Sequence, residues 1–270
     1  MPTETRLSVA AETRFRRARG FHLYDAQGRR WLDLARAGAF LGHRPAGVLT
    51  AMKAALSQGL AGDVPSFWET RLVAHLSRMF PSHPVVRLYS SPERALRAAA
   101  VSGAVMDPAL DPPWPDATGP HAALWRPLLP AVTEATVLLP LLPFASAGAP
   151  APACFRPQAA DAGPSDVLPG YLCAGALRAL GALGAADLGG RFAPASRKLA
   201  AALEGGAWER RGPYVRALFP PDLYARVHAE FFRAGVLLWP TYPGPSLLPG
   251  ECSPGEAHLL ADLFASIPGG

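Results

Sequence analysis

Lysine is almost missing from this sequence. Lys53 and Lys198 are its only lysines, and the other 24 of its 26 basic residues are arginine. Charged residues make up 17% of the chain, below the roughly 25% typical of soluble proteins. Chemistry that needs the primary amine of a side chain therefore has only two candidates in 270 residues.

Cysteine is also scarce. Cys154, Cys173 and Cys252 lie far apart, are odd in number and form no CxxC pair. This spacing favours neither a zinc site nor a disulfide framework. We expect reduced thiols, no bound metal and a location in the cytoplasm. We expect no activated thiol at Cys154, near Arg156, because no base lies close to it in sequence.

Long hydrophobic runs are missing too. The longest apolar stretch, residues 131–145, is interrupted by Pro140 and Pro143 and is too short to span a membrane. The first 15 residues are polar and do not have the pattern of a signal peptide. The sequence therefore predicts no membrane partner.

The chain is basic, with a formal net charge of +5 and a pI of about 9.4. A nucleic-acid-binding protein concentrates its arginines on one face. Here they are scattered, and the clusters at residues 14–19 and 210–211 are short. We therefore expect no nucleic acid as partner. We interpret Arg16, Arg17 and Arg19 as a solvated basic segment before the first strand.

Half of the residues are hydrophobic and the mean hydropathy is +0.12, so the chain can bury a sizeable core. The 30 prolines and 26 glycines predict many turns. Apolar periodicity predicts a mixture of helices and strands. The expected elements are a hairpin over 21–34, helices over 46–60, 67–80, 92–105, 171–183, 196–203, 222–234 and up to about 264, and strands over 85–89, 137–144, 214–219 and 236–240.

Two of the helix starts have clear local signals. Before the helix at 92–105, Ser91 is the expected N-cap, with Pro92 at the first helical position and Glu93 in the first turn. Ser253 and Glu256 have the spacing of a capping box before the last helix. The centre of the chain gives weaker signals: residues 107–120 are rich in proline, and residues 145–161 have the composition of a loop.

Four segments occur in a recognisable order: GFHLYDAQGRRWLDL with LGHRPAGVLTAMKAALSQG, then RLVAHLSRMFPSHPVVRLYSSPERALRAAAV, then PSDVLPGYLCAGALRALGAL, and finally FFRAGVLLWPTYPGPSLLPGECSPGEAHLLADLF. Together they resemble the class III aminotransferases, in particular the glutamate-1-semialdehyde aminomutase branch. The resemblance covers both ends of the chain well and its middle poorly. The middle is also much shorter than in the working enzymes.

The resemblance implies an α/β fold, a reduced form of the fold type I architecture of pyridoxal 5′-phosphate (PLP) enzymes. Residues 1–82 would form the N-terminal part of a small α+β domain together with interface helices. Residues 83–193 would be a truncated remnant of the large, PLP-binding α/β domain, and residues 194–270 would complete the small domain. Enzymes of the family form homodimers, so the resemblance also implies a homodimer.

The family's chemistry needs a lysine that forms a Schiff base with PLP, an acid on the pyridine nitrogen, a phosphate cradle at a helix N-terminus and an aromatic ring on the cofactor. Lys53 precedes the phosphate-loop equivalent. Lys198 follows the helix that the family's lysine should precede. Neither fits the position of the Schiff-base lysine.

The other requirements are met poorly. The strand with the best match to the acid's position, VLLPLLPFASAG, is followed by no acid. Ser90 and Ser91 partly keep the phosphate-loop pattern, although Pro92 removes an N–H donor. His121, Trp125 and Phe144 are possible partners for the cofactor ring, and the sequence favours none of the three. No cofactor is therefore expected.

Several other residues could have a functional role, but a structural role is the simpler interpretation of each. We interpret His43 as a hydrogen-bonded turn histidine. Asp25 and Asp33 serve the hairpin turn and the strand end in this interpretation. The three tryptophans that might line a pocket are interpreted as packing residues. They are Trp31, Trp68 and Trp239.

The sequence thus predicts a degenerate aminotransferase-like protein that lacks the Schiff-base lysine. It would be non-catalytic and would either bind or modulate a partner, for example a full-length aminotransferase, or retain a pocket for a small-molecule ligand of unknown identity. The alternative is an active PLP-dependent class III aminotransferase or aminomutase, with PLP as its cofactor.

Overall fold

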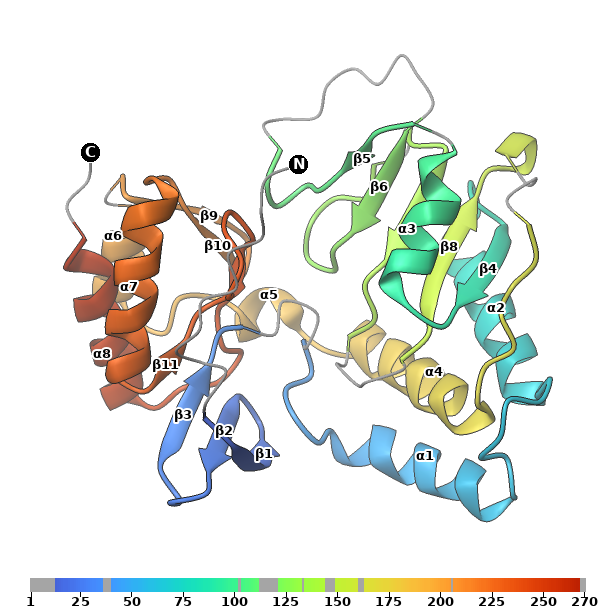
Figure 1. Cartoon of the computed structure of the whole chain (residues 1–270), viewed down its shortest axis with the longest axis horizontal. Coiled ribbons are helices and arrows are strands. Elements are labelled where there is room, and N and C mark those ends of the chain that lie inside the picture. The colour runs from blue at the N-terminus through green and yellow to red at the C-terminus, as the bar shows by residue number, and fades with distance from the viewer. Residues whose placement is uncertain are drawn as a thin grey trace. The chain divides into compact units, whose positions relative to one another are not determined.

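In the computed structural model the chain forms two compact units (Figure 1). Unit 1 comprises Met1–Arg44 and Asp187–Gly270, and unit 2 comprises Pro45–Ala186. The structure describes residues 13–35, 40–101, 103–111, 121–132, 134–143, 149–159, 163–204 and 206–267. The assignment of 1–82, 83–193 and 194–270 to parts of a larger enzyme stays a prediction.

The first sheet of unit 1 is built on the expected hairpin. Its strand order is β1 (Phe15–Arg19), β2 (His22–Asp25), β3 (Arg30–Asp33) and β11 (Val236–Leu237), with β11 parallel to β3. The Asp25 carboxylate accepts the backbone N–H groups of Gln27 and Arg29 and so closes the β2–β3 turn. The predicted turn role of Asp25 is confirmed.

The expectation for the basic segment was wrong in one respect. Arg16, Arg17 and Arg19 do not precede the first strand but lie within β1, antiparallel to β2. Their side chains are exposed, as expected for a solvated segment. A strand at the edge of a sheet can carry such charges because only one of its edges is paired, and charge there discourages further pairing.

The rest of unit 1 is a small three-stranded sheet and four helices. The sheet order is β12 (Ser246–Leu247), β10 (Tyr214–Ala217) and β9 (Trp208–Arg211). Aromatic rings dominate the core, and the Trp208 ring meets the Phe264 ring edge to face at 4.9 Å between centroids. The helices are α5 (Leu188–Arg191), α6 (Arg197–Leu203), α7 (Pro221–Arg233) and α8 (Pro254–Ala265).

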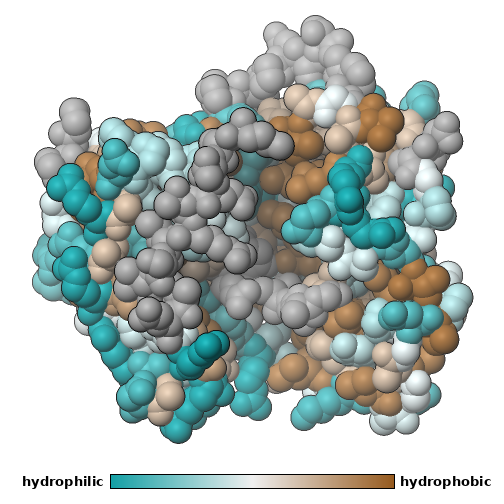
Figure 2. All heavy atoms as spheres, in the orientation of Figure 1, coloured by the Kyte–Doolittle hydropathy of each residue, from teal (hydrophilic) through white to brown (hydrophobic). Residues whose placement is uncertain are grey.

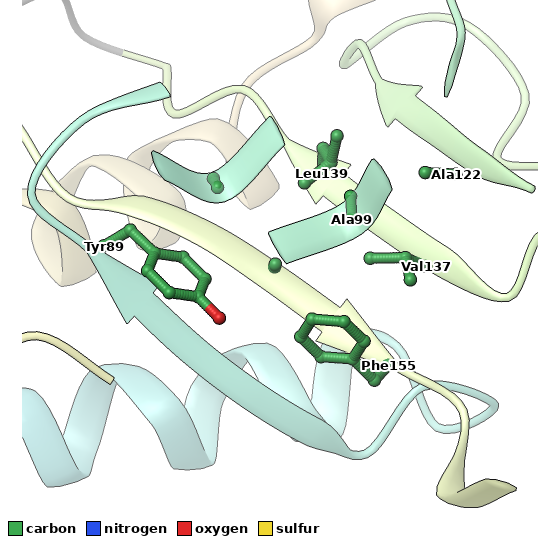
Figure 3. Close-up of a cluster of buried hydrophobic side chains, with 8 residues drawn as sticks. Tyr89, Ala99, Ala122, Val137, Leu139 and Phe155 are labelled. Atoms are coloured by element: carbon green, nitrogen blue, oxygen red, sulfur yellow. The ribbon is translucent and has the colours of Figure 1, made fainter. Parts of the chain in front are cut away.

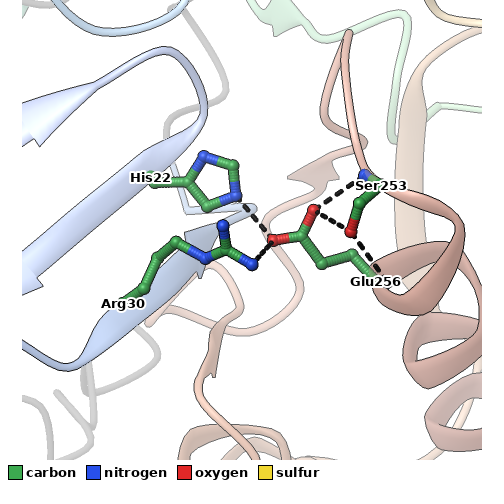
Figure 4. Close-up of polar contacts among 4 residues, drawn as sticks. All are labelled: His22, Arg30, Ser253 and Glu256. Atoms are coloured by element: carbon green, nitrogen blue, oxygen red, sulfur yellow. Dashed lines mark hydrogen bonds and ion pairs between the residues drawn. The ribbon is translucent and has the colours of Figure 1, made fainter.

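The predicted capping box at the start of α8 is confirmed and is part of a larger polar cluster (Figure 4). One oxygen of Glu256 accepts the N–H and the hydroxyl of Ser253, both at 2.8 Å. The other lies 2.8 Å from His22 Nε2 and 3.0 Å from Arg30 Nη2. Partial burial opposes ionisation of Glu256, but these hydrogen bonds outweigh it and lower its pKa.

Unit 2 contains a five-stranded sheet. The strand order is β4 (Val85–Tyr89), β8 (Ala151–Phe155), β7 (Val137–Pro140), β6 (Ala122–Trp125) and β5 (Val105–Met106). Strands β5, β6 and β7 are parallel, and β8 is antiparallel to both of its neighbours. Strand β4 therefore runs in the same direction as β5, β6 and β7. The carboxyl ends of these four strands meet at one edge of the sheet.

The helices of unit 2 are α1 (Ala46–Ser57), α2 (Phe67–Met79), α3 (Pro92–Ala100) and α4 (Gly170–Gly184). All except α3 lie close to the predicted ranges. Helix α4 packs on α1 and α2, whereas α3 packs against the sheet. The buried cluster beneath α3 includes Tyr89, Val137 and Phe155 from three strands and Ala99 from α3 (Figure 3). The alanines of α3 allow the helix to approach the sheet closely.

Two expectations for the middle of the chain were wrong. Residues 145–161 were expected to be loop, but β8 lies among them and pairs with β4 and β7. Its sequence, APACF, has no polar alternation because both faces are covered, and Pro152 obscures it further. The helix expected to reach 105 ends at Ala100. Gly103 then takes a φ of 119°, and β5 begins at Val105.

Candidate functional site

The candidate site is the edge of the unit 2 sheet where β4, β5, β6 and β7 end. In open α/β sheets, ligands bind outside the carboxyl ends of the strands. Three polar residues follow directly after these strands: Ser90 after β4, Asp107 after β5 and Arg126 after β6. Sequence reasoning found Ser90 but missed the other two.

Ser90 binds the carboxylate of Asp166. Its N–H donates to Asp166 Oδ2 at 2.9 Å, and its hydroxyl donates to the same oxygen at 2.7 Å. Arg94 Nη2, one helical turn into α3, donates to Asp166 Oδ1 at 2.5 Å. The donors expected to hold a phosphate are therefore directed at a carboxylate of the chain itself.

Ser91 caps α3, as predicted. Its side chain accepts the N–H of Arg94 at 3.3 Å, and Pro92 stands at the first helical position. A side-chain hydrogen bond from Ser91 lowers the pKa of Glu93, whose carboxylate also lies at this helix start. Ser91 is thus occupied by the helix, and Pro92 has no N–H to offer a ligand.

A second ion pair lies where β5 and β6 end. Arg126 Nε donates to Asp107 Oδ1 at 2.6 Å, and its Nη2 donates to Asp107 Oδ2 at 2.5 Å. Both side chains are largely buried, with 9% and 13% of their surface exposed. An acid does follow one of the strands, but its charge is neutralised by an arginine in two-pronged geometry.

The two lysines lie elsewhere. Lys53 is an exposed residue of α1, a helix that packs on α4. Lys198 is an exposed residue of α6 in unit 1, where its Nζ donates to Asp262 Oδ1 at 2.6 Å. It borders an open hollow of about 350 Å³ lined otherwise by small and apolar side chains. Neither amine therefore lies at a strand end of the unit 2 sheet.

Three more of the residues considered in the sequence, His43, Asp33 and Trp125, make local contacts. The ring of His43 lies 2.6 Å from Asp33 Oδ2, and the His43 backbone pairs with Gly20. Trp125 packs edge to face on Phe80, with ring centroids 5.1 Å apart. The interpretations of His43 as a turn histidine and of Asp33 as a strand-end residue are confirmed. Phe144, one of the candidate ring partners, lies outside the described residues.

The thiol of Cys154 is fully buried, and burial raises its pKa to about 12. This agrees with the expectation that it is not an activated thiol. Of the three tryptophans, Trp31 is buried and donates its indole N–H to Asp25 Oδ2 at 2.9 Å. Trp68 and Trp239 are half-buried.

Over the described residues, no group of three or more His, Cys, Asp or Glu side chains is arranged to hold a metal ion. Within the same ranges, no helix has the length and hydrophobicity needed to cross a bilayer.

The residues present do not fit PLP. The cradle donors of α3 are used by Asp166, and a second carboxylate, Glu93, stands beside them. The residue that follows β6 is a cation rather than an acid, and the acid that follows β5 is bound to it. No lysine follows any strand of this sheet. We therefore derive no reaction step through the cofactor.

Asp166, Arg94, Asp107 and Arg126 were not predicted from the sequence. Asp166 lies 76 residues from Ser90, and Arg126 lies 19 residues from Asp107. No local pattern indicates either pairing. The one available signal was for Arg126 and Asp107, since each directly follows a short apolar run.

The chain is similar to several proteins. A scan against models of known families finds no match. An uncharacterized protein of Treponema pallidum (strain Nichols) is 28% identical over 286 residues, covering 87% of this chain and 89% of its own length. A glutamate-1-semialdehyde 2,1-aminomutase of Syntrophobacter fumaroxidans is 30% identical over 86 residues, which are 31% of this chain and 20% of that protein.

Solved structures extend the similarity to nearly the whole chain. An (S)-enantioselective omega-transaminase from Thermomicrobium roseum matches with a TM-score of 0.67 at 14% identity, covering 94% of this chain and 91% of the other. A glutamate-1-semialdehyde-aminomutase from Pseudomonas aeruginosa PAO1 matches with a TM-score of 0.66 at 16% identity, covering 94% and 87%. The chain thus has the mixed α/β fold of class III aminotransferases, as the sequence resemblance implied. At these identities the similarity establishes the fold alone.

Proposed function

We propose that this protein is a reduced, non-catalytic relative of the class III aminotransferases that acts by binding a partner. One observation carries the proposal: neither Lys53 nor Lys198 follows a strand of the unit 2 sheet, and Lys198 is paired with Asp262. A transaminase needs an amine that forms and breaks a Schiff base at its cofactor. This chain offers no such amine at the strand ends, where cofactors of open α/β sheets bind.

The arrangement of charges supports the same proposal. At the strand ends, Arg126 is bound to Asp107 and Ser90 to Asp166, so the polar groups satisfy one another. Catalytic sites commonly keep polar groups poised for a substrate. Here they are engaged in internal pairs. The finer assignments, a small α+β domain from the two chain ends and a truncated PLP domain between them, belong to this proposal.

The experiment is a test for a covalent coenzyme. The purified protein is incubated with PLP and reduced with borohydride, and modified lysines are located by peptide mass spectrometry. We expect no absorption band of an internal aldimine. Any reduced adduct should be no more abundant than in the urea-unfolded chain. Lys198→Ala and Lys53→Ala are the matched variants.

An active aminotransferase or aminomutase, the activity for which the similar proteins are named, predicts the opposite. The folded protein would show an aldimine band, and one of the two variants would lose it together with the trapped adduct. That outcome would overturn the proposal and restore the enzymatic alternative. It would also show which amine carries the coenzyme.

For the partner we propose a second copy of this chain. Hydrophobic side chains gather over the region of α1, α2 and α4 in unit 2 (Figure 2). Among the exposed ones are Leu56 at the end of α1, Val64 in the connection and Phe67 at the start of α2, with 42%, 47% and 69% of their surface exposed. Such apolar exposure favours association, and self-association is the commonest form.

Sedimentation velocity tests the homodimer. We expect the wild type to sediment as a dimer and Phe67→Glu to shift it towards the monomer. Val101→Glu, at an apolar position that is 83% exposed on another part of unit 2, should leave the dimer unchanged. A wild-type monomer at micromolar concentration would refute the homodimer. A full-length aminotransferase would then be the next partner to test.

A further inference from the structure

Asp166 belongs to a segment that is hydrogen-bonded to strand β4. The Leu88 N–H donates to Ser165 Oγ at 3.1 Å, and the Asp166 N–H donates to the Leu88 carbonyl at 2.8 Å. Arg87 Nε donates to the Gly163 carbonyl at 3.1 Å. The segment 163–166 therefore runs along β4 on the side opposite β8, where none of the described strands pairs with it. This brings the Asp166 carboxylate to the carboxyl end of β4, at the start of α3.

The groups around this carboxylate are those that proteins use to bind an anion. They comprise an N–H group, a hydroxyl and a guanidinium, from Ser90 and Arg94, at 2.5–2.9 Å. The amino end of α3 adds its partial positive charge. Charge-assisted hydrogen bonds of this kind are stronger than neutral ones. A phosphate ester would present its oxygens to the same donors.

Asp166 also excludes such a ligand. Only 16% of its side-chain surface is exposed, and its two oxygens take all three donors. Glu93 adds a second negative charge at the same helix start, and Pro92 removes one N–H. An incoming phosphate dianion would therefore have to displace one carboxylate and approach another, against like-charge repulsion.

We propose that Asp166 is an internal anion that takes the place of a ligand phosphate at the start of α3. The chain then folds without a phosphate-bearing coenzyme and keeps one out of this position. This inference deepens the proposed function and rests on it. Because Asp166 supplies the negative charge that Ser90 and Arg94 bind, the aminotransferase-like fold needs no coenzyme phosphate at this position.

The test is a chemical rescue with inorganic phosphate. Asp166→Ala should lower the melting temperature by about 3–6 °C, because the donors lose their anion. Millimolar phosphate should restore at least half of that loss in a saturable way, whereas chloride at equal ionic strength should not. Wild-type protein should gain nothing from phosphate beyond the chloride effect.

Three further variants sharpen the result. Asp166→Asn keeps the shape but removes the charge, so it should show the same phosphate response even if the alanine variant does not fold. Adding Arg94→Ala to either variant should abolish the rescue. Asp262→Ala removes the exposed partner of Lys198 in unit 1, away from Ser90 and Arg94 in the sequence, and phosphate should not rescue it.

Two outcomes would overturn the inference: saturable stabilisation of the wild type by phosphate, or the absence of a phosphate response in both Asp166 variants. Neither depends on the lysine test. A trapped lysine adduct in a protein whose Asp166 variants are rescued would refute the proposed function and leave this inference standing. If phosphate rescues neither Asp166 variant and no lysine adduct is trapped, this inference is refuted and the proposed function stands.

Discussion

Arg126 holds Asp107 by two parallel hydrogen bonds where two neighbouring parallel strands end. The pair is mostly shielded from water, so each charge depends on the other. The resemblance implies an acid that follows an apolar strand and binds the pyridine nitrogen of the cofactor. The structure has instead an acid whose charge is neutralised within the protein.

Removal of the Arg126 side chain should destabilise the folded protein. Arg126→Ala leaves the Asp107 carboxylate buried without its cation, and we expect a loss of about 3 kcal/mol in the free energy of unfolding. Urea denaturation measures it. Lys198→Ala, which breaks an ion pair whose side chains are half-exposed, is the matched control and should cost about 0–1 kcal/mol.

The double variant Arg126→Ala/Asp107→Ala should recover part of the loss, because it no longer buries an unpaired charge. Equal stability of Arg126→Ala and wild type would mean that the pair contributes nothing to the fold.

Of two glycines with similar φ angles, Gly42 should tolerate substitution by alanine less well than Gly28. Gly42 has a φ of 73° and Gly28 a φ of 83°, which L-residues adopt reluctantly. A Cβ at Gly42 would lie 2.8 Å from the Gly20 carbonyl oxygen, whereas at Gly28 it would meet nothing within 4 Å.

Gly28→Ala should therefore cost about 1 kcal/mol and Gly42→Ala about 3 kcal/mol or more. The difference tests the close approach of Gly42 to Gly20, which brings His43 to Asp33. Similar unfolding midpoints for the two variants would contradict it.

The three cysteines should differ in reactivity. Cys154 and Cys173 are buried, and burial raises the pKa of each thiol to about 12, with the charge of Glu69 adding to the effect at Cys173. Cys252 is only half-buried, although burial also raises its pKa. Titration of the native protein with a disulfide reagent at pH 8 should show one accessible thiol.

Cys252→Ser should remove that fast phase, while unfolding in urea should release the remaining thiols. Rapid reaction of all three cysteines in the native protein would show that the interior of unit 2 is open to the reagent.

Two buried histidines should make stability depend on pH near neutrality. Burial lowers the pKa of His83 and His228 below the usual 6.5, although hydrogen bonds to the carbonyls of Ala135 and Leu238 partly oppose it. The unfolded chain therefore binds these protons more readily than the folded one. Their contribution is fully present above about pH 6.5 and is lost as the pH falls through the folded pKa values.

We expect the free energy of unfolding to decline between pH 7.5 and 5.5. His228→Gln should flatten that decline, and His258→Gln, at an exposed position, should leave it unchanged. The carboxylates of Asp166 and Glu256, whose pKa values lie below their usual 3.8 and 4.5, add a further loss at lower pH. A flat profile down to pH 5.5 would contradict the histidine contribution.

Much of the local structure could be predicted. The helix start at Ser91 and the capping box of Ser253 and Glu256 were expected and are present. Their hydrogen bonds join groups three residues apart, so the spacing of residue types is enough to indicate them. The hairpin and most helices follow for the same reason, because apolar periodicity is a short-range signal.

Strand β8 and the helix end after Ala100 were not predicted, since the first depends on its neighbours in the sheet. A run such as APACF becomes a strand only when β4 and β7 supply the hydrogen-bonding partners. Its burial on both faces removes the alternation that would reveal it.

The sequence by itself determined that only two amines were available, and it determined the helix caps and the order of elements that resembles an aminotransferase. Only the tertiary structure decided that Ser90 and Arg94 bind Asp166 and that Arg126 binds Asp107. The reason is physical: those partners lie 76, 72 and 19 residues apart. Their meeting depends on the path of the folded chain, which no local pattern encodes.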